Sequence, residues 1–379
     1  MIRQRGFSLI ELMVAVTLAL IVTAAVLSVF VGSRNAFMST SGMASIADGG
    51  RFALTFIQNS VRNAGYMGCA TSQTAGVAAG VAPAILNSGT PAPVDSFIVS
   101  FGQGLGGFEA NNTNPGASYT VSAPPVTADA IGGDWVSGLD LAFSGLVVKN
   151  NDVLVVRSTV RSSSAPALVT AIADGAGNFT VNALGSPPLQ QNQLAVISDC
   201  VKFVAFQVSG INGSSPSITI GHASGGSPGN SGSAFPVSFQ NGAEVTPVDT
   251  VAYYIGRGAD GDGALFAWDL NSPNAPTQTE IVPDIEAMQV LYGIDTTGSQ
   301  TVSEYVTANN VLAQAVNGEG FNGVMSVKVA VLAASAPGAV PKPAAATTYN
   351  LLGTLVTAPI DTRARQVFDI TIGLRNLVP

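Results

Sequence analysis

The chain opens with an apolar segment that is long enough to cross a membrane. Residues 7–31 form a run of 25 residues in which the polar positions are Ser8, Glu11, Thr17, Thr23 and Ser28. At 1.5 Å per residue, a helix of this length extends about 37 Å, against a hydrocarbon core of roughly 30 Å. The segment therefore predicts a transmembrane helix at the start of the chain.

The flanking charges predict how this helix is oriented. Arg3 and Arg5 precede it, and the next basic residue is Arg34. The positive-inside bias then keeps the N-terminus in the cytoplasm and exports the rest of the chain. Ala24-Ala25 could serve as a conventional signal cleavage site, but a secretory signal has an apolar core of only about 7–15 residues. The longer run favours a helix that is retained.

A single acidic residue, Glu11, lies near the start of this run. On insertion scales a carboxylate at the centre of a bilayer costs roughly 2.5–3.5 kcal/mol, so a chain that keeps one usually provides a partner. A simpler interpretation places Glu11 near the cytoplasmic interface, where the positive end of its own helix favours it. Either interpretation makes Glu11 the unusual residue of the segment.

The residues around Glu11 carry a resemblance to a known class of signals. The stretch GFSLIEL at 6–12, continued by MVA at 13–15, resembles the class III signal of type IV prepilins and type II secretion pseudopilins. In that family a membrane peptidase cuts after the glycine and methylates the new amino terminus. The resemblance implies cleavage between Gly6 and Phe7, methylation of Phe7, and a Phe7 ammonium group that neutralises Glu11 of a neighbouring subunit.

The helix is predicted to continue beyond the membrane. Between residues 34 and 63, apolar residues recur at helical spacing, which predicts one apolar stripe that a sheet must cover. The stripe consists of Ile46, Ala53, Ile57 and Val61. Gly42, Gly49 and Gly50 each cost up to about 1 kcal/mol relative to Ala in a helix, so a bend or local melting is expected there. Ala64-Gly65 predicts the end of the helix.

Composition indicates a β-rich exported domain after this helix. The 379 residues are 47% hydrophobic and only 10% charged, which supports a large core rather than disorder. A net charge of −8 argues against a nucleic-acid partner, which would need a basic face. The chain has 42 glycines, well above average usage, and glycine together with Ser, Ala, Thr and Asn fills long stretches that are typical of loops joining short strands.

Short strands are predicted at residues 95–101, 152–157, 168–173, 194–197 and 202–208. Four longer runs alternate apolar residues with period two and predict an antiparallel sheet with one buried face. They are centred on Tyr253, Tyr292, Val329 and Ile370. Residues 333–348 form a loop too long for a hairpin turn.

Five patches along the chain resemble the PilW-type minor pilins. They are NAGY at 63–66 leading to Gly68-Cys69, SDC at 198–200, VAYYIGR at 251–257 with ALF at 264–266, residues 282–295, and RARQVFDITIGLRN at 363–376. The resemblance implies an α+β, pilin-like fold, in which a long N-terminal helix with a transmembrane first half packs on a large antiparallel β-sheet domain. The expected organisation is a cleaved leader at 1–6, a helix at 7–65 and a β-rich domain at 66–379. Its Gly/Ala-rich part, about 71–150, fits no pattern.

The chain has two cysteines, Cys69 and Cys200. An even number in an exported protein favours one disulfide over two buried thiols. Such a bridge would close a loop of more than 100 residues and join the end of the helix to the sheet region.

Other candidates for chemistry are weak. His222, the only histidine, lies in a Gly/Ser-rich segment at 221–233 that predicts a flexible loop with a solvated histidine, and no catalytic motif accompanies it. An enzyme is not expected, and no cofactor is implied. Asp260 and Asp262 resemble the start of a calcium loop that lacks its later acidic ligands, so a hairpin turn is the favoured interpretation.

Arg363, Arg365 and Arg375 form the one dense basic cluster of the exported part. They could contact an acidic partner subunit, although arginines beside a terminal strand are usually solvated or paired at its edge.

The resemblance thus implies a PilW-type minor pilin that primes type IV pilus assembly near the tip. The implied partners are the prepilin peptidase, other minor and major pilins, the bacterial inner membrane and, as a further candidate, a tip adhesin. The globular domain is expected in the periplasm and then on the pilus. Two alternatives remain open: a type II secretion pseudopilin, and an anchored adhesive domain that never polymerises.

Overall fold

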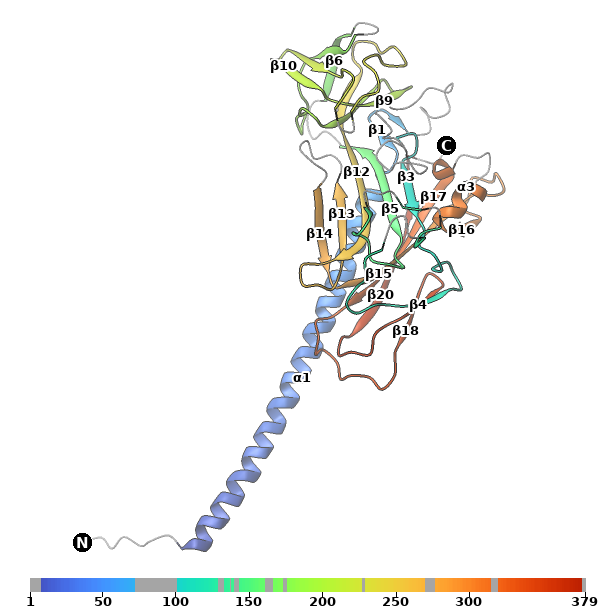
Figure 1. The fold of residues 1–379 in the computed structure, drawn as a ribbon. Coiled ribbons are helices and arrows are strands. Elements are labelled where there is room, and N and C mark those ends of the chain that lie inside the picture. The colour runs from blue at the N-terminus through green and yellow to red at the C-terminus, as the bar shows by residue number, and fades with distance from the viewer. Residues whose placement is uncertain are drawn as a thin grey trace, which may run out of the picture.

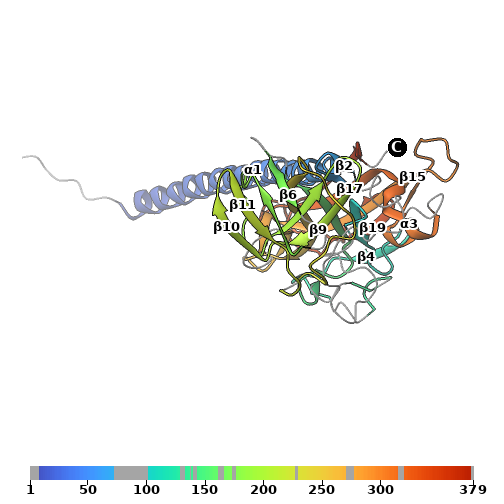
Figure 2. The ribbon, with the colours of Figure 1, turned by 90° about the horizontal axis from the view of Figure 1, so that it is seen from above.

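The computed structural model describes residues 8–71, 101–128, 133–136, 138–139, 143–160, 166–172, 176–226, 229–269, 277–314 and 320–376. A long helix, α1 (Leu9–Val61), projects from a β-rich domain (Figure 1). Seen from above, α1 runs along one side of the sheets and leaves the domain at one end (Figure 2). The expected α+β, pilin-like architecture is confirmed.

The second half of α1 packs on the sheets through the predicted apolar stripe. Ile46, Ala53, Ile57 and Val61 are all buried, and they contact strands of two sheets in the main core. Apolar residues at helical spacing place their side chains on one face, so one side of the helix is buried and the other stays exposed. The helix ends at Val61, and the chain then turns through Gly65, whose φ is +76°.

The bend predicted at the helix glycines is wrong. α1 is continuous through Gly42, Gly49 and Gly50, and it shows no kink in Figure 1. A Cβ atom on Gly50 would lie 2.2 Å from the Phe368 ring, and one on Gly42 would lie 2.7 Å from the Ala339 Cβ. These two glycines therefore let the helix approach the sheet closely, and the packing they permit offsets their low helix propensity.

An eleven-stranded sheet forms the larger part of the domain. Its strands are β3 (Leu105–Phe108), β5 (Val153–Thr159), β6 (Ala167–Ile172), β7 (Asn178–Val181), β8 (Leu194–Ser198), β9 (Phe203–Gln207), β10 (Gly210–Ser214), β11 (Ser217–Gly221), β12 (Glu244–Arg257), β13 (Gly263–Asp269) and β14 (Thr277–Pro283). β12 is the longest and links two regions, because one half pairs with β5 and β13 and the other with β6 and β8. Four of the short predicted strands are confirmed, and the fifth, at 95–101, lies almost wholly outside the described residues.

A four-stranded sheet lies against α1 and contains β15 (Ile285–Ile294), β16 (Glu304–Val306), β17 (Val324–Ala334) and β20 (Arg365–Gly373). Three of the four alternating runs are neighbours here, and their register aligns Val290, Val329 and Ile370 in one row. The fourth run lies in β12, so the prediction of one sheet for all four is wrong. Between β15 and β17 the chain forms a short helix, α3 (Ala308–Gln314), and a 3₁₀ turn, η3 (Gly320–Gly323).

The prediction of a single buried face is also wrong for β15 and β17. A three-stranded sheet packs on their second face and consists of β4 (Ser118–Thr120), β18 (Thr348–Leu351) and β19 (Thr354–Thr357). Its Leu351 and Val356 pack in one apolar cluster with Ala330 and Leu332, on the side of β17 away from the main core. Strands that are buried on both faces are apolar at nearly every position. A pattern of alternating apolar residues predicts only one buried face, so it underestimates how much of these two strands is buried.

Strands β6 to β11 and the start of β12 form a distal module at the end of the molecule opposite the helix N-terminus (Figure 1). The module has its own apolar core, which includes Phe179, Ile197, Phe206 and Ile220. It is joined to the rest of the domain through β12 and through the disulfide described below.

His222 lies in the core of this module, so the prediction of a solvated histidine is wrong. Its side chain is 0% exposed and stacks on Phe235 with ring centroids 4.1 Å apart, while Phe179 and Phe206 approach at 5.6 and 5.8 Å. Burial lowers the pKa of His222 to about 4.

The Gly/Ser-rich segment beside His222 is held against the module by a buried asparagine. The Asn230 side chain accepts a hydrogen bond from the Gln207 N–H at 2.8 Å and donates to the carbonyls of Gln207 and Ala223. The prediction of a flexible loop from composition alone missed these contacts.

Candidate functional site

The first half of α1 has no cover within the described structure. None of the residues from Leu9 to Phe37 is buried, and Gly42 is the first buried residue of the helix. Leu9, Ile10 and Phe30 are 77%, 72% and 65% exposed. Among the described residues, α1 is the one helix long and apolar enough to cross a membrane. Exposed apolar surface of this extent marks a membrane or protein interaction site.

The polar residues of this half are satisfied inside the helix. The hydroxyls of Thr17, Thr23 and Ser28 donate to backbone carbonyls three or four residues earlier, at 2.7 to 2.9 Å. Hydrocarbon cannot form hydrogen bonds, so a polar group in a bilayer must find its partner within the protein. A hydroxyl that donates to a carbonyl of its own helix meets this requirement. Three of the five polar positions are thereby compatible with a bilayer.

Glu11 has a partner that the sequence analysis missed. The Ser8 N–H donates to the Glu11 carboxylate at 2.9 Å, and the Glu11 N–H donates to the Ser8 hydroxyl at 3.2 Å. Together they form a capping box at the start of α1, which satisfies two N–H groups that a helix N-terminus leaves unpaired. The pattern Ser-x-x-Glu before an apolar run was visible in the sequence and is the known signature of this motif.

Gly6 and Phe7, the predicted cleavage and methylation positions, lie outside the described residues. Within the described part of the chain, Glu11 forms no ion pair. A cationic group next to Glu11 therefore has to come from residues 1–7 or from another molecule.

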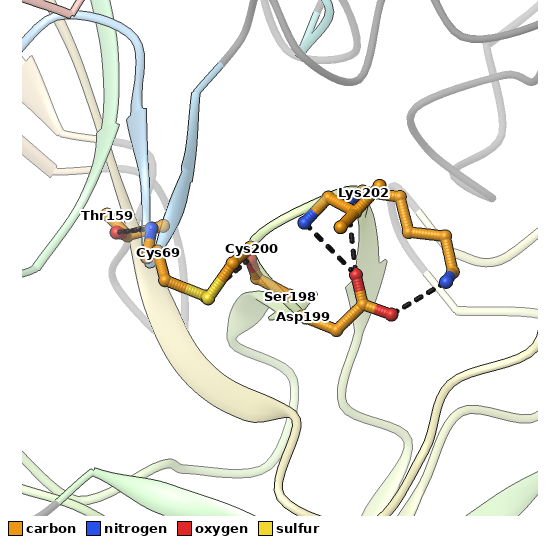
Figure 3. The surroundings of a disulfide bond; sticks show 8 residues. Cys69, Thr159, Ser198, Asp199, Cys200 and Lys202 are labelled. Atoms are coloured by element: carbon orange, nitrogen blue, oxygen red, sulfur yellow. Dashed lines mark hydrogen bonds and ion pairs between the residues drawn. A yellow bond between two sulfur atoms is a disulfide. The ribbon is translucent and has the colours of Figure 1, made fainter.

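The two cysteines form the predicted disulfide, with their Cα atoms 4.4 Å apart and a sequence separation of 131. Cys69 lies in the turn between β1 (Tyr66–Met67) and β2 (Ala70–Thr71), just after α1, and Cys200 follows β8 in the distal module. The bridge thus ties the chain just after the helix to the distal module. Figure 3 shows the two cysteines and their surroundings.

Hydrogen bonds hold both ends of this bridge. The Gly68 N–H donates to the Thr159 hydroxyl at 3.2 Å. On the other side, the Asp199 carboxylate accepts from the Lys202 N–H at 3.1 Å and from the Lys202 ammonium at 2.6 Å (Figure 3). These contacts fix the two turns that present the sulfur atoms.

Two of the three clustered arginines are paired within the domain. The Arg365 guanidinium contacts the carboxylates of Glu286 and Asp361 at 2.5 to 2.9 Å, and its side chain is only 4% exposed. Arg363 contacts Asp284 at 2.7 Å and also Asp262. Neither is solvated or free to meet an acidic subunit, whereas Arg375 is exposed.

The Asp260–Asp262 segment is the favoured hairpin turn. Arg257 pairs with Gly263 across β12 and β13, and the Asp262 N–H donates to the Asp260 carboxylate at 3.0 Å. Oxygen atoms of Asp260, Asp262 and Asp284 lie within 4.8 Å of one another. The cation that contacts two of these three carboxylates is the Arg363 guanidinium, so the group is part of an internal ion-pair network.

The long helix with an uncovered apolar half, packed on antiparallel sheets and followed by a disulfide, defines a pilin-like protein. Residues 252–376 match the family described as type IV pilus-assembly protein W, and residues 1–27 match the prokaryotic N-terminal methylation motif. The chain therefore carries a PilW type IV pilus-assembly domain together with a prepilin methylation motif. This family is structural rather than enzymatic.

The family match covers part of β12 and every later strand, including the four-stranded sheet and the paired arginines. No curated protein and no solved structure matches the chain.

Proposed function

We propose that the chain is a minor pilin of the type IV pilus. The observation that carries the proposal is the uncovered apolar half of α1, which overlaps the methylation motif and has no intramolecular partner among the described residues. In lipid, helices associate through dispersion and shape, because burial in hydrocarbon gives no drive of its own. The exposed apolar surface of α1 can contact lipid in the membrane and the helices of neighbouring subunits in the fibre.

In this proposal, prepilin peptidase cuts between Gly6 and Phe7 and the new Phe7 amine is methylated. The resulting ammonium group neutralises Glu11 of a neighbouring subunit, and this offsets a cost of roughly 2.5–3.5 kcal/mol for a carboxylate in lipid. The capping box with Ser8 holds the Glu11 side chain at the first turn of the helix. The pair is complete only when subunits stack, so it favours assembly over the isolated chain.

The proposed place of the protein follows from its charges and its family. Arg3 and Arg5 favour a cytoplasmic N-terminus, with the globular domain in the periplasm. There the subunit joins other minor pilins to prime the fibre, and it takes a position near the tip, where an adhesin is a candidate neighbour. Membership of the PilW type supports this role.

The test separates the charge of Glu11 from its capping role. Glu11→Gln keeps a capping-box residue and removes the charge, whereas Ser8→Ala removes the cap and keeps the charge. We expect Glu11→Gln to insert in the membrane normally and to be largely lost from purified pili, with Ser8→Ala retained. Normal incorporation of Glu11→Gln would refute the pairing, and loss of Ser8→Ala alone would assign Glu11 a helix-capping role.

Deletion of the gene distinguishes the pilus from a secretion system. The proposal expects loss of surface pili and twitching with protein secretion unchanged. The opposite pattern would identify a pseudopilin.

A further inference from the structure

A cleft lies between the last turns of α1 and the sheet formed by β12, β13 and β14. It has a volume of about 500 Å³, within the range of ligand-binding pockets. The helix lines it with Phe56, Asn59, Ser60 and Asn63, and the strands line it with Asp249, Tyr253, Asp269 and Thr279 among others. None of its described lining residues is a lysine or an arginine.

Two carboxylates bring negative charge to this cleft. Asp249 and Asp269 lie on neighbouring strands, and since Asp269 pairs with Val251, they are diagonal neighbours on one face of the sheet. Burial, together with repulsion from Asp269, raises the pKa of Asp249 to about 6. The helix ends beside the cleft at Arg62, an exposed C-cap residue that is not part of the lining, and the carbonyls of Gln58 and Ser60 already accept backbone hydrogen bonds. Asp249 forms no salt bridge among the described residues.

The cleft also has an aromatic wall. Phe56 and Tyr253 line the cleft and pack edge-on with ring centroids 6.1 Å apart, while Phe52 lies outside the lining, with its ring centroid 6.2 Å from that of Phe56. Phe52 and Phe56 are 55% and 38% exposed. Aromatic faces attract cations and also cover the apolar stems of long basic side chains. An anion would be repelled here, and a bare metal ion has no apolar stem for the rings to cover.

These features fit a long cationic side chain, with an apolar stem against the rings and a charged head at the carboxylates. Phe52, Phe56, Asn59 and Asn63 follow one another at helical spacing, so they lie on one face of α1, beside the buried stripe. A subunit stacked along the uncovered half of the same helix would extend over this face.

We propose that the cleft receives a lysine or arginine side chain from a neighbouring pilin subunit. This inference rests on the proposed function, because it requires that the chain stack against other subunits. It adds a charged contact in the exported domain that is independent of Glu11.

The first experiment titrates the full chain in detergent micelles with N-acetyl-arginine amide and follows binding by NMR. The neutral isostere N-acetyl-citrulline amide is the matched ligand. We expect saturable binding of the arginine probe alone, weakened about tenfold by Asp249→Asn, since one charge-assisted contact is lost. Glu304→Gln, on the exposed edge strand β16, is the control and should leave binding unchanged. No saturable binding, equal binding of citrulline, or an unaffected Asp249→Asn would overturn the inference.

The second experiment places Asp249→Lys in the native gene and measures its abundance in purified pili against wild type and Glu304→Lys. We expect at least a tenfold loss for Asp249→Lys alone, with leader cleavage and the disulfide intact as controls for folding and export. If wild type and Asp249→Lys are equally abundant in purified pili, this inference is wrong and the proposed function stands. If wild type is absent from purified pili, the proposed function is wrong, and this inference is wrong with it.

Discussion

The buried histidine predicts that the distal module loses stability in acid. The pKa of His222 falls from 6.5 to about 4 on folding because the ring is removed from water. The folded state therefore binds fewer protons than the unfolded state between pH 6.5 and 4, and stability is lost as the pH falls through this window. Linkage gives about 2 kcal/mol between pH 7.5 and pH 5, and about 3 kcal/mol by pH 4. Neither ring nitrogen has a hydrogen-bond partner among the described residues, and burial is the dominant cause of the shift.

The assay compares wild type with His222→Phe, which keeps an aromatic ring and removes the titration. Hydrogen exchange of the amides in β7 and β11, corrected for intrinsic rates, reports the free energy of opening of the module. Wild type should lose about 2 kcal/mol from pH 7.5 to pH 5, and the variant should lose less than half of that. Equal slopes for the two proteins would show that His222 is not the titrating group, or that its ring is solvated.

Two further predictions concern how α1 is attached to the sheets. Gly50→Ala places a Cβ 2.2 Å from Phe368 and should destabilise the domain by roughly 1–3 kcal/mol in thermal unfolding. The neighbouring Gly49→Ala, whose Cβ would meet the Val282 side chain at an ordinary 3.5 Å, should be neutral or stabilise the helix by up to about 1 kcal/mol; equal losses in both would refute the close-approach explanation. Replacing Cys69 and Cys200 by alanine should cost about 4–5 kcal/mol in the chain-entropy model, measured by urea unfolding, and wild type denatured without reductant should show no free thiol. Two titratable thiols in that assay would contradict the bridge.

The features predicted best are those that a short stretch of sequence determines. The apolar run and the stripe at Ile46, Ala53 and Ile57 depend only on the local spacing of apolar residues. The disulfide could be predicted because the chain has an even number of cysteines. The capping box at Ser8 and Glu11 is equally local, but the resemblance to prepilin signals implied a partner for Glu11 on another subunit instead.

The failures share a different cause, which is contact between segments far apart in the chain. Gly50 weakens an isolated helix, yet its role depends on Phe368 in the last strand. His222 lies in a Gly/Ser-rich segment, but phenylalanines from other strands enclose it. Arg365 finds Glu286 on a strand that local patterns cannot place beside it. In each case tertiary packing overrides local propensity.

The central claim is that the chain functions only after its leader has been removed, because the ammonium group that neutralises Glu11 does not exist before cleavage. The most direct measurement is mass spectrometry of the N-terminal peptide from protein recovered with pili. The account predicts a peptide that begins at Phe7 and carries one methyl group on its amine, with residues 1–6 absent. Recovery of the functional protein with residues 1–6 still attached would contradict it.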